Sequence, residues 1–378
     1  MSDRAGVPAT YALIAGGGTA GHVLPAVAVA RELVARGHEP SSLHFVASSR
    51  GRDGRTIEDA GFTSTLLPGR GIQRRLTAEN LAAAWGLVRA LGQAVALVRR
   101  RRPRVVLAVG GFASAAAALA AVLWRVPLVV AEQNARAGAA NRLVARFAAA
   151  TAVPFAETDL PRATVTGNPV RDDVLAAVDL DPVAARDALD LPADRRVLAA
   201  FAGSLGSRRI NTAVWEAVAG PWRDRDDLAV HHVVGERDWP DLPEALAGGL
   251  DGPGSVTYHP VRYEDRMATL LAAADLAVCR AGGTTVAELA VLGVPAVLVP
   301  LPIATRDHQT ANAGPLVRAG AAALVPDDRL DAVRLVAEVD PLLAGDTAGM
   351  AAAARALGHP GAAAAVADLV ERAAERAA

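Results

Sequence analysis

The run Ala15-Gly16-Gly17-Gly18-Thr19-Ala20-Gly21-His22 decides the fold of the first half of this sequence. It follows a short apolar segment, residues 11–15, and precedes a helical pattern that starts near Pro25 and extends through Arg36. Its glycines fit G-x-G-x-x-G, the pattern of a tight turn that brings backbone amides to a phosphate at a helix N-terminus. The sequence therefore predicts a Rossmann-like α/β domain with a phosphate-binding loop.

A second glycine run lies in the other half, at residues 279–288 (CRAGGTTVAE). It again combines a strand end, a glycine turn and a helix start, whose amides and hydroxyls suit a diphosphate. Glu288, about one turn into that helix, could accept hydrogen bonds from two ribose hydroxyls, or it could be an ordinary exposed glutamate. The polar segment at residues 307–312 is open to two interpretations as well, a sugar-binding cluster or a helix cap.

Short apolar runs alternate with Ala-rich helical stretches, which predicts βαβ units and parallel sheets. The expected strands are residues 11–15, 43–47, 105–109, 128–131 and 163–166, then 197–202, 229–234, 255–258, 276–279, 296–300 and 322–325. Since 378 residues exceed one usual core, and Gly167-Asn168-Pro169 breaks helix and strand, we expect two domains. They are residues 1–170 and 171–346, followed by C-terminal helices, residues 347–378, that pack back on the N-terminal domain.

Composition excludes several classes of protein. With 52% hydrophobic and 21% charged residues the chain is globular. The basic residues are all arginine, so Schiff-base chemistry and a P-loop lysine are excluded. The single cysteine, Cys279, fits a reducing compartment, and no signal peptide is evident. Residues 105–124 carry no charge, but Gly110-Gly111 interrupts them, so we expect strand, turn and buried helix rather than a membrane span.

Polar loops follow the expected strands at residues 110–114, 132–134 and 203–207. Ligands bind at the carboxyl ends of parallel strands, so these loops and the two glycine loops predict a cleft between the domains. His22, beside a helix N-terminus that disfavours its cation, could serve as a neutral base, or it could be a hydrogen-bonded loop histidine. The spacing Asp179-Leu180-Asp181 is that of a metal-binding D-x-D, but its place after a short helix favours a turn or cap.

Five segments together resemble the MurG family, the family 28 glycosyltransferases that act on lipid I in bacterial peptidoglycan synthesis. They are residues 17–25 (GGTAGHVLP), 132–134 (EQN), 167–171 (GNPVR), 280–288 (RAGGTTVAE) and 308–312 (HQTAN). The resemblance covers nearly the whole chain. It implies a GT-B fold, α/β with two Rossmann-like domains whose parallel sheets face a central cleft. It also implies inverting transfer of N-acetylglucosamine from UDP-GlcNAc to the C4 hydroxyl of the muramoyl sugar of lipid I, without cofactor or metal.

The resemblance also assigns residues. His22 is the candidate catalytic base, and Gly18, Gly111 and Ser114 belong to loops for the acceptor and diphosphate. The donor site would comprise Thr19, Ala20, Gly21, Asn134, Arg171, Ser204, Val261, Gly283, Thr284, Glu288 and Gln309. Two positions depart from the family: Leu205 stands where glutamine is common, which puts one donor contact in doubt, and Ala20 stands where glycine is common.

A membrane-facing patch is expected near the first domain. Residues 70–104 contain nine arginines and one acid, Glu79. An anionic leaflet attracts such a region by ~1 kcal/mol per Arg near the surface. The expected patch is Ile72, Arg74, Arg75, Leu76, Trp85 and Trp124; the alternative is a solvated helix face. We therefore expect a peripheral protein on the cytoplasmic face of the cell membrane, with cell-wall synthesis and division proteins as partners and no nucleic acid, since aromatic residues are scarce.

Three alternatives remain open from the sequence. An NADP-dependent oxidoreductase would use residues 16–21, with Ser48, Ser49 and Arg50 on the 2'-phosphate. A GT-B glycosyltransferase with another acceptor, or a UDP-sugar epimerase, would share the same spacing. A catalytically inert UDP-sugar or lipid-binding protein would bind the donor without turnover.

Overall fold

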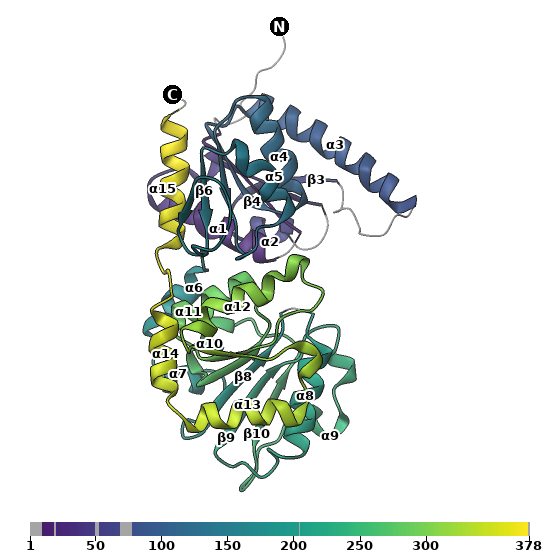
Figure 1. Ribbon diagram of the computed structural model, residues 1–378, viewed down its shortest axis with the longest axis vertical. Helices are drawn as coiled ribbons and strands as arrows, with labels where there is room; N and C mark the ends of the chain where they lie inside the picture. Colours follow the sequence, from purple (N-terminus) through teal and green to yellow (C-terminus); the bar gives the residue numbers. More distant parts are fainter. Residues whose placement is uncertain (1–9, 19, 50–52, 69–77, 204, 377–378) are drawn as a thin grey trace. The chain divides into compact units, whose positions relative to one another are not determined.

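The computed structural model describes residues 10–18, 20–49, 53–68, 78–203 and 205–376, which fall into two compact units (Figure 1). Unit 1 extends to Arg171 and resumes at His359, and unit 2 is Asp172–Gly358. Each unit is a parallel sheet covered by helices on both faces, so the predicted pair of Rossmann-like α/β domains is confirmed.

Unit 1 contains a seven-stranded parallel sheet in the order β3-β2-β1-β4-β5-β6-β7. The strands are β1 (Ala12–Gly16), β2 (Leu43–Ser48), β3 (Thr63–Leu67), β4 (Val105–Gly110), β5 (Leu128–Ala131), β6 (Ala150–Val153) and β7 (Ala163–Val165). Strands β3 and β6 were not predicted from the sequence. Both are short and contain threonine or serine, so they lack the apolar run that marks a buried parallel strand.

Helices cover both faces of the unit 1 sheet. One face carries α1 (Ala20–Ala35), α2 (Asp53–Asp59) and α15 (Ala362–Glu375), and the other carries α3 (Ala78–Arg101), α4 (Phe112–Leu123) and α5 (Ala139–Val144). The uncharged stretch at residues 105–124 is therefore β4 followed by α4, as predicted. Among the helices in the described parts of the chain, none is both long and apolar enough to cross a bilayer.

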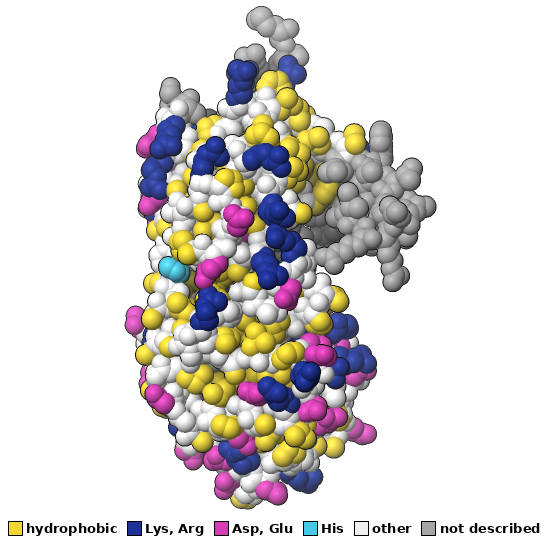
Figure 2. Space-filling view, in the orientation of Figure 1, with side chains coloured by type: hydrophobic (Ala, Val, Ile, Leu, Met, Phe, Trp, Pro, Cys, Tyr) yellow, Lys and Arg dark blue, Asp and Glu magenta, His cyan; other side chains and the backbone are white. Residues whose placement is uncertain are grey.

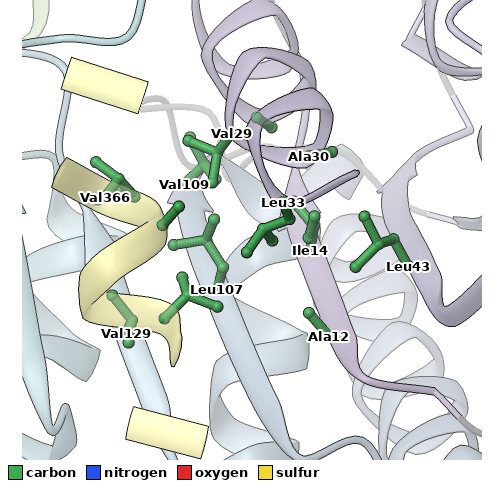
Figure 3. Packing of buried hydrophobic residues seen from close by; sticks show 14 of the residues in the cluster. Ala12, Ile14, Val29, Ala30, Leu33, Leu43, Leu107, Val109, Val129 and Val366 are labelled. Atoms are coloured by element: carbon green, nitrogen blue, oxygen red, sulfur yellow. The ribbon is translucent and has the colours of Figure 1, made fainter. Parts of the chain in front are cut away.

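The last helix completes the core of unit 1. Figure 3 shows Val366 of α15 beside Leu107, Val109 and Val129 of the sheet, and all four side chains are buried. Ion pairs from Arg36 to Asp368 and Glu371, at 2.6 and 2.7 Å, add to this packing. The two C-terminal helices belong to different units, because α14 (Thr347–Arg355) packs on α11 (Gly283–Leu292) of unit 2.

Unit 2 contains a six-stranded parallel sheet in the order β10-β9-β8-β11-β12-β13. Its strands are β8 (Arg196–Phe201), β9 (Leu228–Val233), β10 (Thr257–Val261), β11 (Leu276–Cys279), β12 (Ala296–Leu298) and β13 (Ala322–Leu324). Two helices, α8 (Arg208–Ala219) and α13 (Ala332–Ala344), cover one face around the buried Trp222. The other helices are α6 (Asp172–Ala176), α7 (Pro182–Asp187), α9 (Glu244–Ala247), α10 (Met267–Ala273), α11 (Gly283–Leu292) and α12 (His308–Arg318).

Candidate active site

Both sheets have a topological switch point, where successive connections turn to opposite sides of the first strand. It lies between β1 and β4 in unit 1 and between β8 and β11 in unit 2. Open parallel sheets bind ligands at the carboxyl ends of the strands at such a point. Each predicted glycine loop begins at the end of one of these strands.

The first glycine loop is fixed by two contacts far along the chain. The Gly17 amide donates to the Gly110 carbonyl at 3.3 Å, and the Gly18 amide donates to the Asp53 carboxylate at 2.5 Å. Asp53 is buried at the start of α2 and was not among the predicted residues. Helix α1 starts at Ala20 rather than near Pro25, so His22 lies in its first turn instead of in a loop before it.

The His22 ring lies against Gly110. A Cβ built on Gly110 would be 2.9 Å from His22 Nε2 and 3.5 Å from Gln133 Oε1. Gln133 is buried and donates from Nε2 to the Ala131 carbonyl at 2.9 Å, while its Oε1 has no hydrogen-bond partner among the described residues. The imidazole and an amide oxygen therefore approach the same point above β4.

A buried carboxylate shapes the loop that follows β5. Glu132 Oε1 accepts from the Asn134 amide at 3.0 Å and from Asn134 Nδ2 at 3.1 Å. Glu132 Oε2 accepts from the Gly138 amide at 3.0 Å and from Asn141 Nδ2 at 2.9 Å. Asn134, which was predicted to contact the donor substrate, is thus held in place by Glu132. The sequence pattern did not indicate that Glu132 would accept these hydrogen bonds.

The remaining predicted residues of unit 1 have varied environments. Ser114 is buried and its hydroxyl accepts from the Gly110 amide at 3.2 Å, so it shapes the loop from below. Gly111 is the N-cap of α4. Arg171 is partly exposed and is the last residue of unit 1 before the chain enters unit 2. Ala20 begins α1, partly exposed Gly21 follows it, and Trp85 lies within α3. Outside the described residues lie Thr19, Ile72, Arg74, Arg75, Leu76 and Ser204.

Arg280 links the loops at the carboxyl edge of the unit 2 sheet. Its guanidinium donates to Ser207 Oγ at 2.7 Å and to the Val299 carbonyl at 3.0 Å, and it forms an ion pair with Asp327 at 2.6 Å. Ser207 in turn caps α8 by accepting from the Ile210 amide. One arginine thereby connects the loops that follow β8, β12 and β13.

The second glycine loop leads directly into α11. Gly283 and Thr284 are its first two residues, Glu288 is its sixth, and all three are partly exposed. Predicted donor residue Gln309 lies in the first turn of α12, where its Oε1 accepts from the Leu301 amide at 2.8 Å. Val261 ends the edge strand β10.

Neither a reactive thiol nor a D-x-D metal site is formed. Burial, reinforced by the charge of Glu288, raises the pKa of Cys279, so its thiol stays protonated. Asp181 is the N-cap of α7 and accepts from the Ala184 amide at 3.0 Å, which confirms the predicted cap. In the parts of the chain that the structure describes, no three His, Cys, Asp or Glu side chains are grouped as metal ligands.

Comparison with known proteins adds independent evidence. Residues 12–153 match the glycosyltransferase family 28 N-terminal domain, and residues 197–372 match the family 28 C-terminal domain. A UDP-N-acetylglucosamine–N-acetylmuramyl-(pentapeptide) pyrophosphoryl-undecaprenol N-acetylglucosamine transferase of Alkalilimnicola ehrlichii is 42% identical, covering 94% of this chain and 97% of its own. The protein of that name from Salinibacter ruber is 40% identical, covering 100% and 99%. The crystal structure of Acinetobacter baumannii MurG superimposes with a TM-score of 0.72 at 28% identity, covering 96% of this chain and 99% of that one.

Proposed function

Because this chain belongs to glycosyltransferase family 28, we propose that it transfers N-acetylglucosamine from UDP-GlcNAc to the C4 hydroxyl of the muramoyl sugar of lipid I. It is a glycosyltransferase with two Rossmann-like domains. Its full-length relatives carry this transfer in their names. The N-terminal family match lies within unit 1, and the C-terminal match covers most of unit 2 and extends into α15 of unit 1.

The observation that carries the proposal is that both units are built alike, with a glycine loop and a helix N-terminus at the switch point. In unit 2, the N-terminus of α11 at Gly283 and Thr284 would hold the diphosphate of the donor. Glu288 would accept hydrogen bonds from the ribose, and Gln309 would bind hydroxyls of the sugar. The second loop therefore favours a nucleotide-sugar donor over a dinucleotide, which needs only one such loop.

In unit 1, His22 would act as the base. The acceptor oxygen forms a bond to C1 of N-acetylglucosamine while the bond from C1 to the UDP oxygen breaks, and the bonding electrons leave with UDP. The hydroxyl proton passes to the His22 imidazole, which the N-terminus of α1 favours in its neutral form. Glu132, through Asn134, and Gly110, beneath the ring, keep the surrounding loops in place.

The proposed mechanism stabilises the departing diphosphate with helix amides, so it requires no metal. Activity should survive excess EDTA. A strict requirement for Mg²⁺ or Mn²⁺ would contradict this part of the mechanism.

Donor binding separates the proposal from its alternatives. Calorimetric titration should show UDP-GlcNAc binding, whereas an oxidoreductase would bind NADPH through the loop near Ser48 and Ser49. Incubation with UDP-GlcNAc alone should leave the nucleotide sugar unchanged by NMR, whereas an epimerase would convert it. Binding of UDP-GlcNAc without consumption in the presence of lipid I would indicate an inert binding protein.

We further propose that unit 1 attaches to an anionic membrane surface through the edge formed by the amino ends of its strands. Trp124 and Phe147 are 43% and 52% exposed and precede the neighbouring strands β5 and β6. The guanidinium of Arg99 lies 5.7 Å from the Trp124 ring centroid, and that of Arg146 lies 5.9 Å from Phe147.

Charge supports the same surface. Between residues 99 and 151 Glu132 is the one acid, and it is buried at the opposite edge of the sheet. Figure 2 shows arginine side chains among hydrophobic ones on the visible face of unit 1. An anionic leaflet attracts arginines, and exposed aromatic rings insert at the interface, so these residues support the proposed peripheral attachment.

A further inference from the structure

The loop after β8, described at residues 202, 203 and 205–207, contacts a charged pair from the loop after the neighbouring strand β9. Arg237 Nη2 donates to the Gly206 carbonyl at 3.2 Å. The same guanidinium donates to both carboxylate oxygens of Asp238, at 2.7 and 2.8 Å. Asp238 is fully buried, whereas the Arg237 side chain is 53% exposed. A rigid bidentate pair thus fixes a backbone carbonyl of this loop.

The loop also lies directly on the end of β9. Gly206 has a φ of +83°, and a Cβ there would be 2.1 Å from the Val234 carbonyl oxygen. The Gly206 amide closes a turn by donating to the Gly203 carbonyl at 3.1 Å. The position and the conformation of Gly206 are therefore tightly determined, and Arg237 contacts this same residue.

A buried network anchors Asp238 from below. Asn211 Nδ2 donates to Asp238 Oδ2 at 3.1 Å, so Asn211 Oδ1 must accept, and it lies 3.0 Å from His232 Nε2. His232 Nδ1 then accepts from the Tyr258 hydroxyl at 2.9 Å. Burial lowers the pKa of His232 to about 3, which keeps this neutral tautomer. Through this network, α8, β9 and β10 fix the position of the Asp238 carboxylate, which accepts from Arg237.

The support of Gly206 by Arg237 matters because the neighbouring residue is Leu205. Leu205 is 61% exposed and cannot donate a hydrogen bond from its side chain, where the family often has a glutamine amide. We propose that Arg237 and Asp238 are positioning residues for UDP-GlcNAc, an inference that rests on the proposed donor site. They set the shape of the loop so that its backbone, without a side-chain amide at Leu205, meets the donor.

A direct electrostatic attraction between Arg237 and the anionic donor would predict a different pattern. In that case Asp238→Asn would free the guanidinium from its counter-ion and strengthen donor binding. If the pair acts through the loop, Asp238→Asn weakens donor binding instead. Arg237→Lys keeps the charge but cannot bridge Asp238 and Gly206 in the same planar geometry, so it should behave like Arg237→Ala.

The test is UDP-GlcNAc affinity by calorimetry, with KM for donor and for lipid I, on the full chain. Arg237→Ala, Arg237→Lys and Asp238→Asn should each weaken UDP-GlcNAc binding about tenfold, the scale of one charge-assisted hydrogen bond, and leave KM for lipid I unchanged. The matched control is Arg225→Ala. It removes a bidentate pair with Asp227, at 2.6 and 2.9 Å, from the amino end of the same strand β9, and should leave donor affinity unchanged.

Unchanged affinity in the two Arg237 variants, or tighter binding in Asp238→Asn, would overturn the positioning role. Arg237→Lys keeps a positive charge beside the buried Asp238 carboxylate, so it should keep a Tm close to that of the unaltered chain. It therefore decides the matter even if Arg237→Ala or Asp238→Asn loses stability. Failure of the unaltered chain to bind UDP-GlcNAc is a different result, since it would overturn the proposed function itself.

Discussion

The imidazole of His22 occupies the space that a side chain at position 110 would need. An added Cβ on Gly110 would lie 2.7 Å from His22 Cδ2 and 2.9 Å from Nε2, and the backbone φ of +122° is itself rare for other residues. This packing ties the first turn of α1 to the end of β4 across the switch point of the sheet. The orientation of the proposed base therefore depends on a glycine 88 positions away in the sequence, at 110 against 22.

Substitution of Gly110 tests that dependence. Gly110→Ala should displace the His22 ring and lower kcat with little change in UDP affinity, because the proposed nucleotide site lies on unit 2. His22→Ala should lower kcat by ~10²–10⁴-fold, the usual contribution of a general base, and remove the acidic limb of the pH–rate profile.

Gly92→Ala is the control for Gly110→Ala, because a Cβ at this glycine of α3 meets nothing within 4 Å. Full activity in Gly110→Ala would show that the ring position is unimportant. A loss confined to acceptor KM in His22→Ala, with an unchanged pH profile, would assign His22 to acceptor positioning instead.

The two proposed donor contacts should separate by ligand. Glu288→Ala should weaken UDP and UDP-GlcNAc binding equally, by about 2–3 kcal/mol, as expected for lost hydrogen bonds to a carboxylate. Gln309→Ala should weaken UDP-GlcNAc binding alone. Calorimetry with both ligands measures this difference. Equal losses of UDP affinity in the two variants would contradict the assignment.

Membrane attachment should depend on the exposed amino edge of the unit 1 sheet. Arg146→Ala should reduce binding to anionic vesicles about fivefold, from ~1 kcal/mol per arginine, and Trp124→Ala should reduce it further through the lost apolar contact. The control is Val333→Ala, which removes a side chain 77% exposed on unit 2. Co-sedimentation that is equal for all three variants would place attachment elsewhere.

Stability should fall in acid because of buried neutral histidines. Burial, with the charges of Arg101 and Arg100, lowers the pKa of His44 to about 4. The unfolded chain takes up a proton below about pH 6.5 and the folded chain does not, so stability declines from about pH 6.5 toward pH 4, by up to ~1.4 kcal/mol per pH unit. His44→Gln should therefore lose less Tm than the unaltered chain over this range. An equal loss of Tm in both would show that His44 does not drive the decline, and His308→Gln serves as a partly exposed control.

The strands other than β3 and β6, and both glycine loops, could be predicted because their signals are local, an apolar run or a glycine spacing. The start of α1 at Ala20 could not, since Pro25 looked like an N-terminal signal but lies inside the helix. Partner residues were missed where the contact spans the sequence. The bond from Gly18 to Asp53 joins residues 35 apart, and that from Arg280 to Ser207 joins residues 73 apart. Glu132 lies in one of the segments that carry the family resemblance. Its hydrogen bond from the Gly138 amide forms only when the loop between the two residues is folded, so the sequence could not predict it.

The most direct test of the account is transfer itself. The purified chain is incubated with UDP-GlcNAc labelled in the sugar and with lipid I in anionic vesicles, and the lipid fraction and released UDP are measured together. We predict that label enters the lipid as a β-linked disaccharide, with one UDP released for each sugar transferred. Binding of UDP-GlcNAc without labelled lipid, or transfer of the label only to an acceptor other than lipid I, would contradict the account.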